Sequence, residues 1–99
     1  MLAYRWTWMV KPGGMEEVLE LLRAEAKEFN PGYAKARVYT PDISPQMLVY
    51  ELTVENQEAC DKFFDEFNAT PGAAAFWEKW NELTKRLVVT ERWNVMELG

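Results

Sequence analysis

The stretch Leu2-Ala3-Tyr4-Arg5-Trp6-Thr7-Trp8-Met9-Val10-Lys11 alternates large apolar side chains with smaller or more polar ones. A period of two is that of a β-strand, so this stretch predicts an opening strand with two different faces. One face carries three rings, at Tyr4, Trp6 and Trp8. Pro12-Gly13-Gly14 then ends the strand. The two faces of this strand therefore indicate which side chains of the neighbouring strands lie on the same side of the sheet.

A helical period follows the turn. From Met15, apolar residues recur at spacings of three and four up to Phe29, which predicts a helix that ends near Asn30-Pro31-Gly32. Its five glutamates, interspersed with Arg23 and Lys27, are typical of a solvated helix face. These glutamates are Glu16, Glu17, Glu20, Glu25 and Glu28.

Two more strands are predicted at Tyr33 to Thr40 and at Met47 to Val54. The segment from Thr40 to Pro45 between them contains two prolines, which cannot sit inside a paired ladder, so it is expected to be a loop. Asn56 is a plausible N-cap for a second helix with an apolar face formed by Ala59, Cys60, Phe63, Phe64 and Phe67.

Thr70-Pro71 resembles a new helix cap followed by a proline in the first turn. We expect a third helix from here through about Leu87, with the stripe Phe76, Trp80, Leu83 and Leu87. The last strand is then predicted at Val88 to Leu98.

The order of elements is β-α-β-β-α-α-β in a single domain over residues 1–99. Two β-α-β halves with right-handed crossovers generate a ferredoxin-like α+β fold, in which helices cover one face of a four-stranded antiparallel sheet. If the rings of the first strand pack under the helices, the other face carries a mixed set of side chains. That set is Arg5, Thr7, Met9, Arg37, Tyr39, Val49, Glu51, Arg92 and Asn94.

Composition narrows the partners. The 99 residues are 48% hydrophobic, which is more apolar surface than a domain of this size easily buries, so a homodimer is expected. A formal net charge of -5 disfavours binding to nucleic acid or to an anionic membrane surface. No apolar run reaches the length of a membrane span and no signal peptide is recognisable, so a cytoplasmic location is expected.

Two residue counts restrict the chemistry. The chain has no histidine, which removes the commonest general base and metal ligand. The chain has one cysteine, Cys60, which excludes an internal disulfide and a cysteine-based metal cluster. Because Cys60 belongs to an aromatic-rich helical stripe, we expect it to be a core residue.

The chain resembles members of the dimeric α+β barrel superfamily, in particular the antibiotic-biosynthesis-monooxygenase-like and NIPSNAP-like groups. The resemblance covers nearly the whole chain. It rests on four sets of mostly apolar positions: Tyr4 to Val10 running into Pro12-Gly13, Ser44 to Glu51, Ala59 with Phe63, and Pro71 with Phe76 and Trp77.

The resemblance implies a homodimer with a pocket, either between sheet and helices or within a barrel of two sheets. In the monooxygenase-like members it further implies oxidation of an aromatic or polyketide-like substrate by dioxygen, without metal, flavin or other cofactor. Related members that degrade haem use a helix histidine, which this chain lacks.

The candidate site residues follow from the predicted faces. Arg5, Arg37 and Arg92 could converge with Glu51 and Asn94 inside the barrel and hold a carboxylate or phenolate. Alternatively they form a structural salt-bridge set at a dimer interface, or they are exposed edge residues. Tyr39 and Asn94 are either hydrogen-bond donors to a ligand oxygen or satisfied interface groups, and Thr7 lies on the same face. Trp77 and Trp80, three apart on a helix, could border a pocket or belong to the core, as could Trp6 and Trp8.

Three functions remain open from the sequence. The first is a cofactor-independent monooxygenase-like enzyme, for which Glu51 is the available base. The second is a non-catalytic binding protein for a small aromatic or acidic metabolite, and the third is a purely structural or regulatory dimer. The catalytic residues are unknown. Burial would raise the pKa of Glu51 and the neighbouring arginines would lower it, so the site is better suited to holding an anion than to removing a proton.

Overall fold

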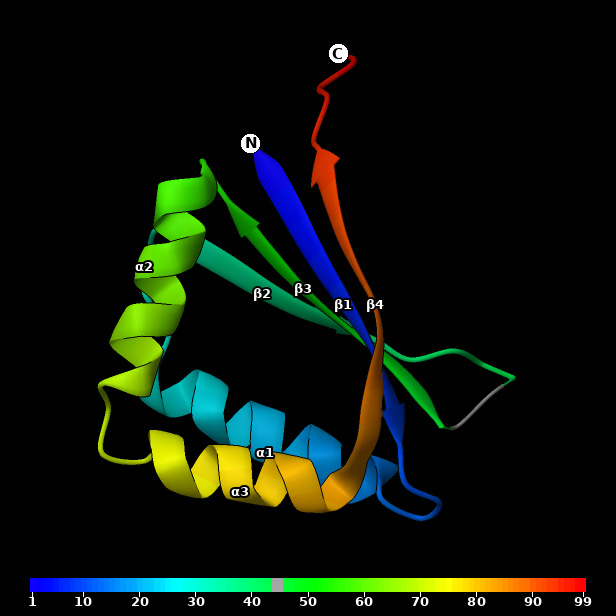
Figure 1. Cartoon of the computed structure of the whole chain (residues 1–99). Helices are drawn as coiled ribbons and strands as arrows, with labels where there is room; N and C mark the ends of the chain where they lie inside the picture. The colour runs from blue at the N-terminus through cyan, green and yellow to red at the C-terminus, as the bar shows by residue number, and fades with distance from the viewer. Residues whose placement is uncertain (44–45) are drawn as a thin grey trace.

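The computed structural model describes residues 1–43 and 46–99, and its core is one antiparallel sheet in the strand order β2-β3-β1-β4 (Figure 1). The predicted loop residues Ser44 and Pro45 lie outside the described residues. The strands are β1 (Leu2–Val10), β2 (Ala34–Tyr39), β3 (Met47–Val54) and β4 (Thr84–Asn94). The helices are α1 (Met15–Glu28), α2 (Gln57–Asn68) and α3 (Ala73–Leu83).

The order β-α-β-β-α-α-β and the ferredoxin-like fold class are confirmed. All three helices lie on one side of the sheet, and the opposite side is uncovered in the single chain (Figure 1). We call this second side the uncovered face. None of the helices in the described ranges is long and apolar enough to cross a membrane.

Local sequence explains where two elements begin. Gly13 has φ 78°, a left-handed conformation that favours glycine, and it lies in the turn that directs the chain from β1 into α1. The predicted cap of α2 is confirmed, since the Asn56 side chain accepts a hydrogen bond of 2.9 Å from the Ala59 backbone N–H.

The prediction that the third helix runs from Thr70-Pro71 to about Leu87 is wrong at both ends. The Thr70 hydroxyl donates to the Phe67 carbonyl at 2.7 Å and so closes the end of α2, while α3 begins at Ala73. At the other end Thr84 turns into β4, where it pairs with Val10 of β1. Pairing with a central strand outweighs the helical spacing, which is why Leu87 lies in β4.

Strand register and burial show which face of the first strand the helices cover, a question that the sequence left open. Opposed residues of antiparallel strands share a face, and Tyr4, Trp6 and Trp8 lie opposite Leu52, Tyr50 and Leu48 of β3. Leu48 and Leu52 have no exposed surface and Tyr4 is buried. The helices therefore pack over the aromatic side of the sheet.

The face predicted for Arg92 and Asn94 is wrong. Arg92 lies opposite Tyr4 and Asn94 opposite Leu2, which places both on the helix-covered side. The cause is a bulge in β4. Leu87 pairs with Trp8 and Val89 pairs with Thr7, so these two residues lie on opposite faces although they are two apart in the sequence. Every residue of β4 after the bulge is therefore on the opposite face from the one that simple alternation predicts. Such a bulge is not visible in the sequence pattern.

Two buried clusters fill the space under the helices. One joins Val10, Val18, Leu48, Phe67, Ala73, Phe76, Trp80 and Leu83, and the other joins Tyr4, Leu52, Val54, Cys60 and Phe63. The interpretation of Cys60 as a core residue is confirmed, since its exposed fraction is 4%. Phe29, at the end of α1, packs against both clusters and links them.

Candidate functional site

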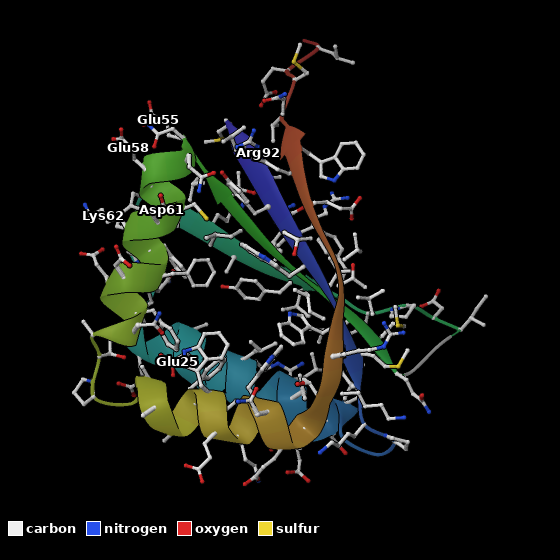
Figure 2. All side chains as sticks on the ribbon, in the orientation of Figure 1. Glu25, Glu55, Glu58, Asp61, Lys62 and Arg92 are labelled. Atoms are coloured by element: carbon white, nitrogen blue, oxygen red, sulfur yellow. The ribbon has the colours of Figure 1, made fainter. Side chains whose placement is uncertain are left out.

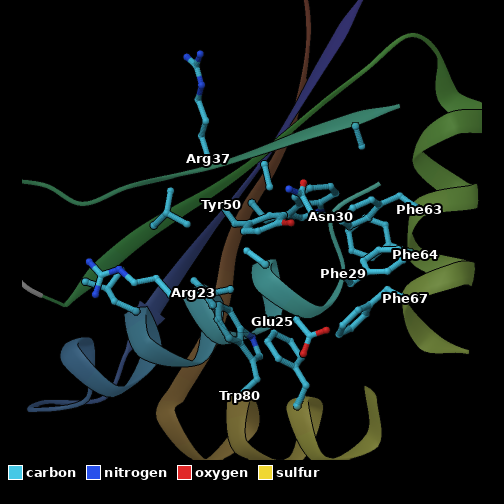
Figure 3. Close-up of a pocket in the computed structure, with 18 of the residues that line it drawn as sticks. Arg23, Glu25, Phe29, Asn30, Arg37, Tyr50, Phe63, Phe64, Phe67 and Trp80 are labelled. Atoms are coloured by element: carbon cyan, nitrogen blue, oxygen red, sulfur yellow. The ribbon is translucent and has the colours of Figure 1, made fainter. Parts of the chain in front are cut away.

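A cavity of about 690 Å³ lies between the sheet and the helices. Figure 3 shows rings projecting toward it from the sheet and from the helices. Its lining residues are Trp6, Trp8, Leu19, Leu22, Arg23, Glu25, Ala26, Phe29, Asn30, Ala34, Lys35, Ala36, Arg37, Val38, Thr40, Tyr50, Phe63, Phe64, Phe67, Phe76, Trp77 and Trp80. A volume of this size is in the range of small-molecule pockets.

The rings of the cavity wall hold one another in place. The Trp8 and Trp80 rings meet edge to face with centroids 5.3 Å apart, and Trp80 stacks on Phe76 at 5.9 Å. On the other side, Trp6 meets Phe64 edge to face at 5.4 Å. Pairs of this geometry are favourable, and they restrict the orientations of the rings in the wall.

The structure places Trp6, Trp8, Trp77 and Trp80 at the boundary between the core and the cavity. Trp80 is buried in the core, Trp6, Trp8 and Trp77 are half-buried, and all four line the cavity. The Trp77 indole N–H donates to the Asn68 side chain at 2.8 Å. The buried Trp80 indole N–H, by contrast, has no hydrogen-bond partner within residues 1–43 and 46–99.

Tyr50 brings a phenol to the cavity from the middle of β3 (Figure 3). Its hydroxyl forms no side-chain hydrogen bond among the described residues. Burial raises the pKa of Tyr50 to about 12, with a smaller contribution from the neighbouring Cys60. The phenol is therefore protonated near neutral pH and is able to donate a hydrogen bond to a ligand.

Glu25 is a lining residue that the sequence pattern does not identify. The pattern places it on a solvated face with four other glutamates, but the structure shows it half-buried at the cavity while Glu16, Glu17, Glu20 and Glu28 are exposed. Desolvation raises the pKa of the Glu25 carboxyl, and the nearby charge of Glu28 raises it further. Glu25 is three residues after Leu22 and four before Phe29, and both of these residues also line the cavity. Residues at these spacings share a helix face, so the sequence does carry an indication that Glu25 faces the cavity.

The predicted polar residues of the uncovered face gather around Glu51. The Arg5 Nε donates to the Glu51 carboxylate at 2.8 Å, and the Tyr39 hydroxyl donates to its other oxygen at 3.1 Å. The Arg5 guanidinium also lies 5.6 Å from the centre of the Tyr39 ring. Glu51 is only 5% exposed, and its hydrogen bond raises the pKa of Arg5. These three residues form a paired, structural cluster.

The other candidates of this face lie around the cluster. Arg37 is opposite Glu51 in the β2–β3 register and forms no ion pair within the described part of the chain. Its side chain points away from the aromatic cavity in Figure 3. An open hollow on this face is bordered by Arg5, Arg37, Tyr39 and Glu51. Asn94, the last residue of β4, also borders it, although its position in the strand register is on the helix-covered side. Thr7 is half-buried beside them, opposite Val49.

The proposed convergence of three arginines is contradicted by Arg92. Its guanidinium donates to the Gln57 side chain of α2 at 3.3 Å, on the helix-covered side of the sheet. Figure 2 shows Arg92 on β4, facing the end of the sheet where α2 begins. Arg92 therefore cannot meet Arg5 and Arg37 in one binding site within this chain.

Comparison with known proteins gives a clear result at the level of structure alone. No protein-family model matches the sequence, and no curated protein sequence matches it. An antibiotic biosynthesis monooxygenase is similar in structure, with a TM-score of 0.75 and 15% identity over 98% of this chain and 100% of that one.

Two NIPSNAP-type proteins from Burkholderia xenovorans are also similar. A NIPSNAP domain protein has a TM-score of 0.79 and 17% identity over 97% of this chain and 95% of that one. A NIPSNAP-like domain protein has a TM-score of 0.81 and 17% identity over 99% of this chain and 87% of that one. The resemblance inferred from the sequence is thus confirmed as one of fold: the chain has the ferredoxin-like fold of the antibiotic biosynthesis monooxygenases and NIPSNAP-domain proteins.

Proposed function

We propose that this protein binds a flat aromatic small molecule in the cavity between sheet and helices, and that it oxidises this molecule with dioxygen without a cofactor. The observation that carries the proposal is the 690 Å³ cavity with its wall of tryptophan, phenylalanine and tyrosine rings. Stacking on such rings favours flat ligands because little flexibility is lost on binding. The fold shared with antibiotic biosynthesis monooxygenases supports the oxidative step.

The proposed oxidation needs no electron source besides the substrate. Dioxygen accepts four electrons, so the ring methylene present in the keto tautomer of a hydroxylated ring loses two C–H bonds and becomes a carbonyl. One oxygen atom of dioxygen ends in this carbonyl and the other in water. An electron-rich, ionisable ring is the species that reacts directly with oxygen. The wall is largely apolar, and the Trp80 N–H and Tyr50 O–H are donors able to stabilise negative charge on such a substrate.

We further propose that two copies of the chain associate through their uncovered faces. Large apolar residues of β4 and the following tail are exposed, among them Val89, Trp93 and Met96. Val89 and Trp93 lie opposite Thr7 and Ala3, so both belong to the uncovered face. A symmetric pairing of this face would remove them from water, and the Arg5–Glu51–Tyr39 cluster would then lie within the interface.

A second candidate function is binding without chemistry, for a small aromatic or acidic metabolite. The cavity supports it, because the Trp80 N–H and the Tyr50 O–H are donors that can hold an oxygen atom of a ligand without removing a proton from it. The third alternative, a structural or regulatory dimer, and the cytoplasmic location both stay predictions from the sequence.

A matched pair of variants tests the cavity. Ala26 and Ala24 are both exposed on α1, but only Ala26 lines the cavity, so Ala26→Phe should narrow it while Ala24→Phe should not. Wild-type protein and both variants are mixed with hydroxylated polycyclic aromatics, and binding is followed by calorimetry. Oxygen uptake and product mass are measured on the same samples.

Each outcome assigns one function. Binding with oxygen uptake, both reduced by Ala26→Phe alone, supports the oxidase activity. Binding that Ala26→Phe weakens, with no uptake and no new mass, supports the non-catalytic binding protein. Absence of binding to every compound contradicts both and favours the structural or regulatory dimer.

A further inference from the structure

Glu25 is the one acidic residue among those that line the aromatic cavity. It extends from α1 in the close-up of Figure 3, among rings contributed by α2 and α3. Within residues 1–43 and 46–99 its carboxylate forms no ion pair and no side-chain hydrogen bond. A half-buried carboxylate thus presents its oxygens to the cavity without a partner from the described chain.

An unpartnered carboxylate beside apolar walls is unfavourable for the free protein. Burial removes water from the charged form, and the direction of the Glu25 pKa shift reflects this cost. An ionised carboxylate only accepts hydrogen bonds, so the group that would satisfy it is an O–H or N–H donor. A ligand that carries such a donor would gain a charge-assisted hydrogen bond.

The other polar groups of the cavity have complementary properties. The Trp80 indole is a donor without a partner, and the Tyr50 phenol remains protonated, so both can donate to an oxygen atom of a ligand. Arg23 lies on α1 and also lines the cavity. Glu25 therefore differs from these neighbours, because its ionised carboxylate accepts hydrogen bonds and cannot donate them.

We propose that Glu25 determines the specificity of this cavity by accepting a hydrogen bond from a hydroxyl or N–H group on a flat aromatic ligand. The inference rests on the proposed binding of such a ligand, and it adds which polar group the ligand must carry. A ring system with a hydroxyl group binds with a hydrogen bond to the Glu25 carboxylate. The same ring system with a methyl ether has no hydrogen to donate, so the carboxylate is left desolvated and without a partner. Rejection of the wrong ligand is strong in such sites because a buried polar group is left unpaired.

The test compares 9-phenanthrol with 9-methoxyphenanthrene and phenanthrene by titration calorimetry. Wild-type protein should bind the hydroxyl compound about tenfold more tightly than the ether, which corresponds to one charge-assisted hydrogen bond of about 1.4 kcal/mol. Glu25→Gln keeps the shape and an acceptor oxygen without charge, so the preference should fall to about threefold. Glu25→Leu should remove the preference while phenanthrene itself binds at least as tightly.

Glu20→Gln is the matched control, because Glu20 is on the same helix, is exposed and does not line the cavity. It should keep the wild-type preference. Equal binding of the hydroxyl compound and the ether by wild-type protein, or an unchanged preference in Glu25→Leu, overturns the role of Glu25 but leaves the binding function standing. If none of the three compounds binds wild-type protein, the proposed function fails and this inference fails with it.

Discussion

The Arg5 guanidinium and the Glu51 carboxylate meet at 2.8 Å on the uncovered face of the sheet, between two adjacent central strands. Glu51 is buried at 5% exposure, whereas the Arg5 side chain is 42% exposed. The pair therefore joins a buried carboxylate, Glu51, to a guanidinium, Arg5, that remains in contact with water. This asymmetry determines what the loss of either partner does to stability.

Glu51→Gln should lower the free energy of unfolding by about 1.5 kcal/mol, because the charged hydrogen bond between Glu51 and Arg5 is lost. This value is near the lower end for hydrogen bonds to charged groups, since water can solvate the half-exposed Arg5 side chain in the variant. Urea denaturation at fixed protein concentration measures the change. Glu91→Gln is the control, since Glu91 lies opposite Arg5 on β4 but forms no salt bridge with it in the described structure. Equal effects of the two substitutions would show that the pair is not specific.

Asn56→Ala should destabilise the protein by about 1 kcal/mol, because the Ala59 backbone N–H loses its side-chain acceptor at the start of α2. Asn56→Asp keeps an acceptor at the cap and should stay close to wild type. Thermal unfolding of the three proteins by circular dichroism checks this. A similar loss in both variants would contradict a capping role.

Tyr50→Phe should change the response of the protein to alkaline pH. Because the pKa of Tyr50 is about 12 in the folded chain and near 10 in an exposed phenol, the unfolded state loses its proton first and stability falls between these values. The variant should lack this part of the alkaline loss. Denaturation at a series of pH values from 9 to 12 measures it, and parallel curves for the two proteins would contradict the assignment.

Glu25→Gln should raise stability at pH 7, even though we expect it to impair ligand discrimination. The folded state raises the pKa of Glu25 above its ordinary value of 4.5, so the ionised form is unfavourable in the fold and the cost disappears as pH falls below that value. The gain over wild type should therefore shrink from pH 7 to pH 4. A gain that is constant with pH, or equal in Glu20→Gln, would contradict this explanation.

Val89→Asp should weaken self-association at least tenfold, because a charge would be placed in the apolar part of the proposed interface. Ala75→Asp adds the same charge to an exposed position of α3 and should leave association unchanged. Sedimentation equilibrium over a concentration series measures both. A wild-type protein that sediments as a monomer at all concentrations would contradict the dimer itself.

Much of the fold could be predicted from local patterns. The alternation around Trp6 and Trp8, the spacing from Met15 to Phe29 and the Asn56 cap each reflect chemistry within one turn or one strand, and the structure confirms them. The end of α3 could not be predicted in this way. Thr84 leaves the helix because it pairs with Val10, a partner far away in the sequence.

The candidate site was harder to predict than the fold. Arg5, Tyr39 and Glu51 do gather on one face, but as a mutually satisfied cluster, and Arg92 lies on the other side. Glu25 stands among residues of the same type. Helical spacing places it near Leu22 and Phe29, but the structure is needed to show that it is half-buried at the cavity. A helix pattern shows which residues share a face, and it does not show which neighbour covers that face.

By itself the sequence determined the order of the elements and the division of the first strand into an aromatic and a mixed face, since alternating side chains point to opposite faces of a sheet. Which of these two faces the helices cover was decided by the tertiary structure. The tertiary structure alone decided which polar groups reach the cavity and which face carries Arg92 and Asn94. The physical reason is that a bulge within one strand reverses the side on which later residues lie, and that desolvation of Glu25 depends on rings contributed by other elements.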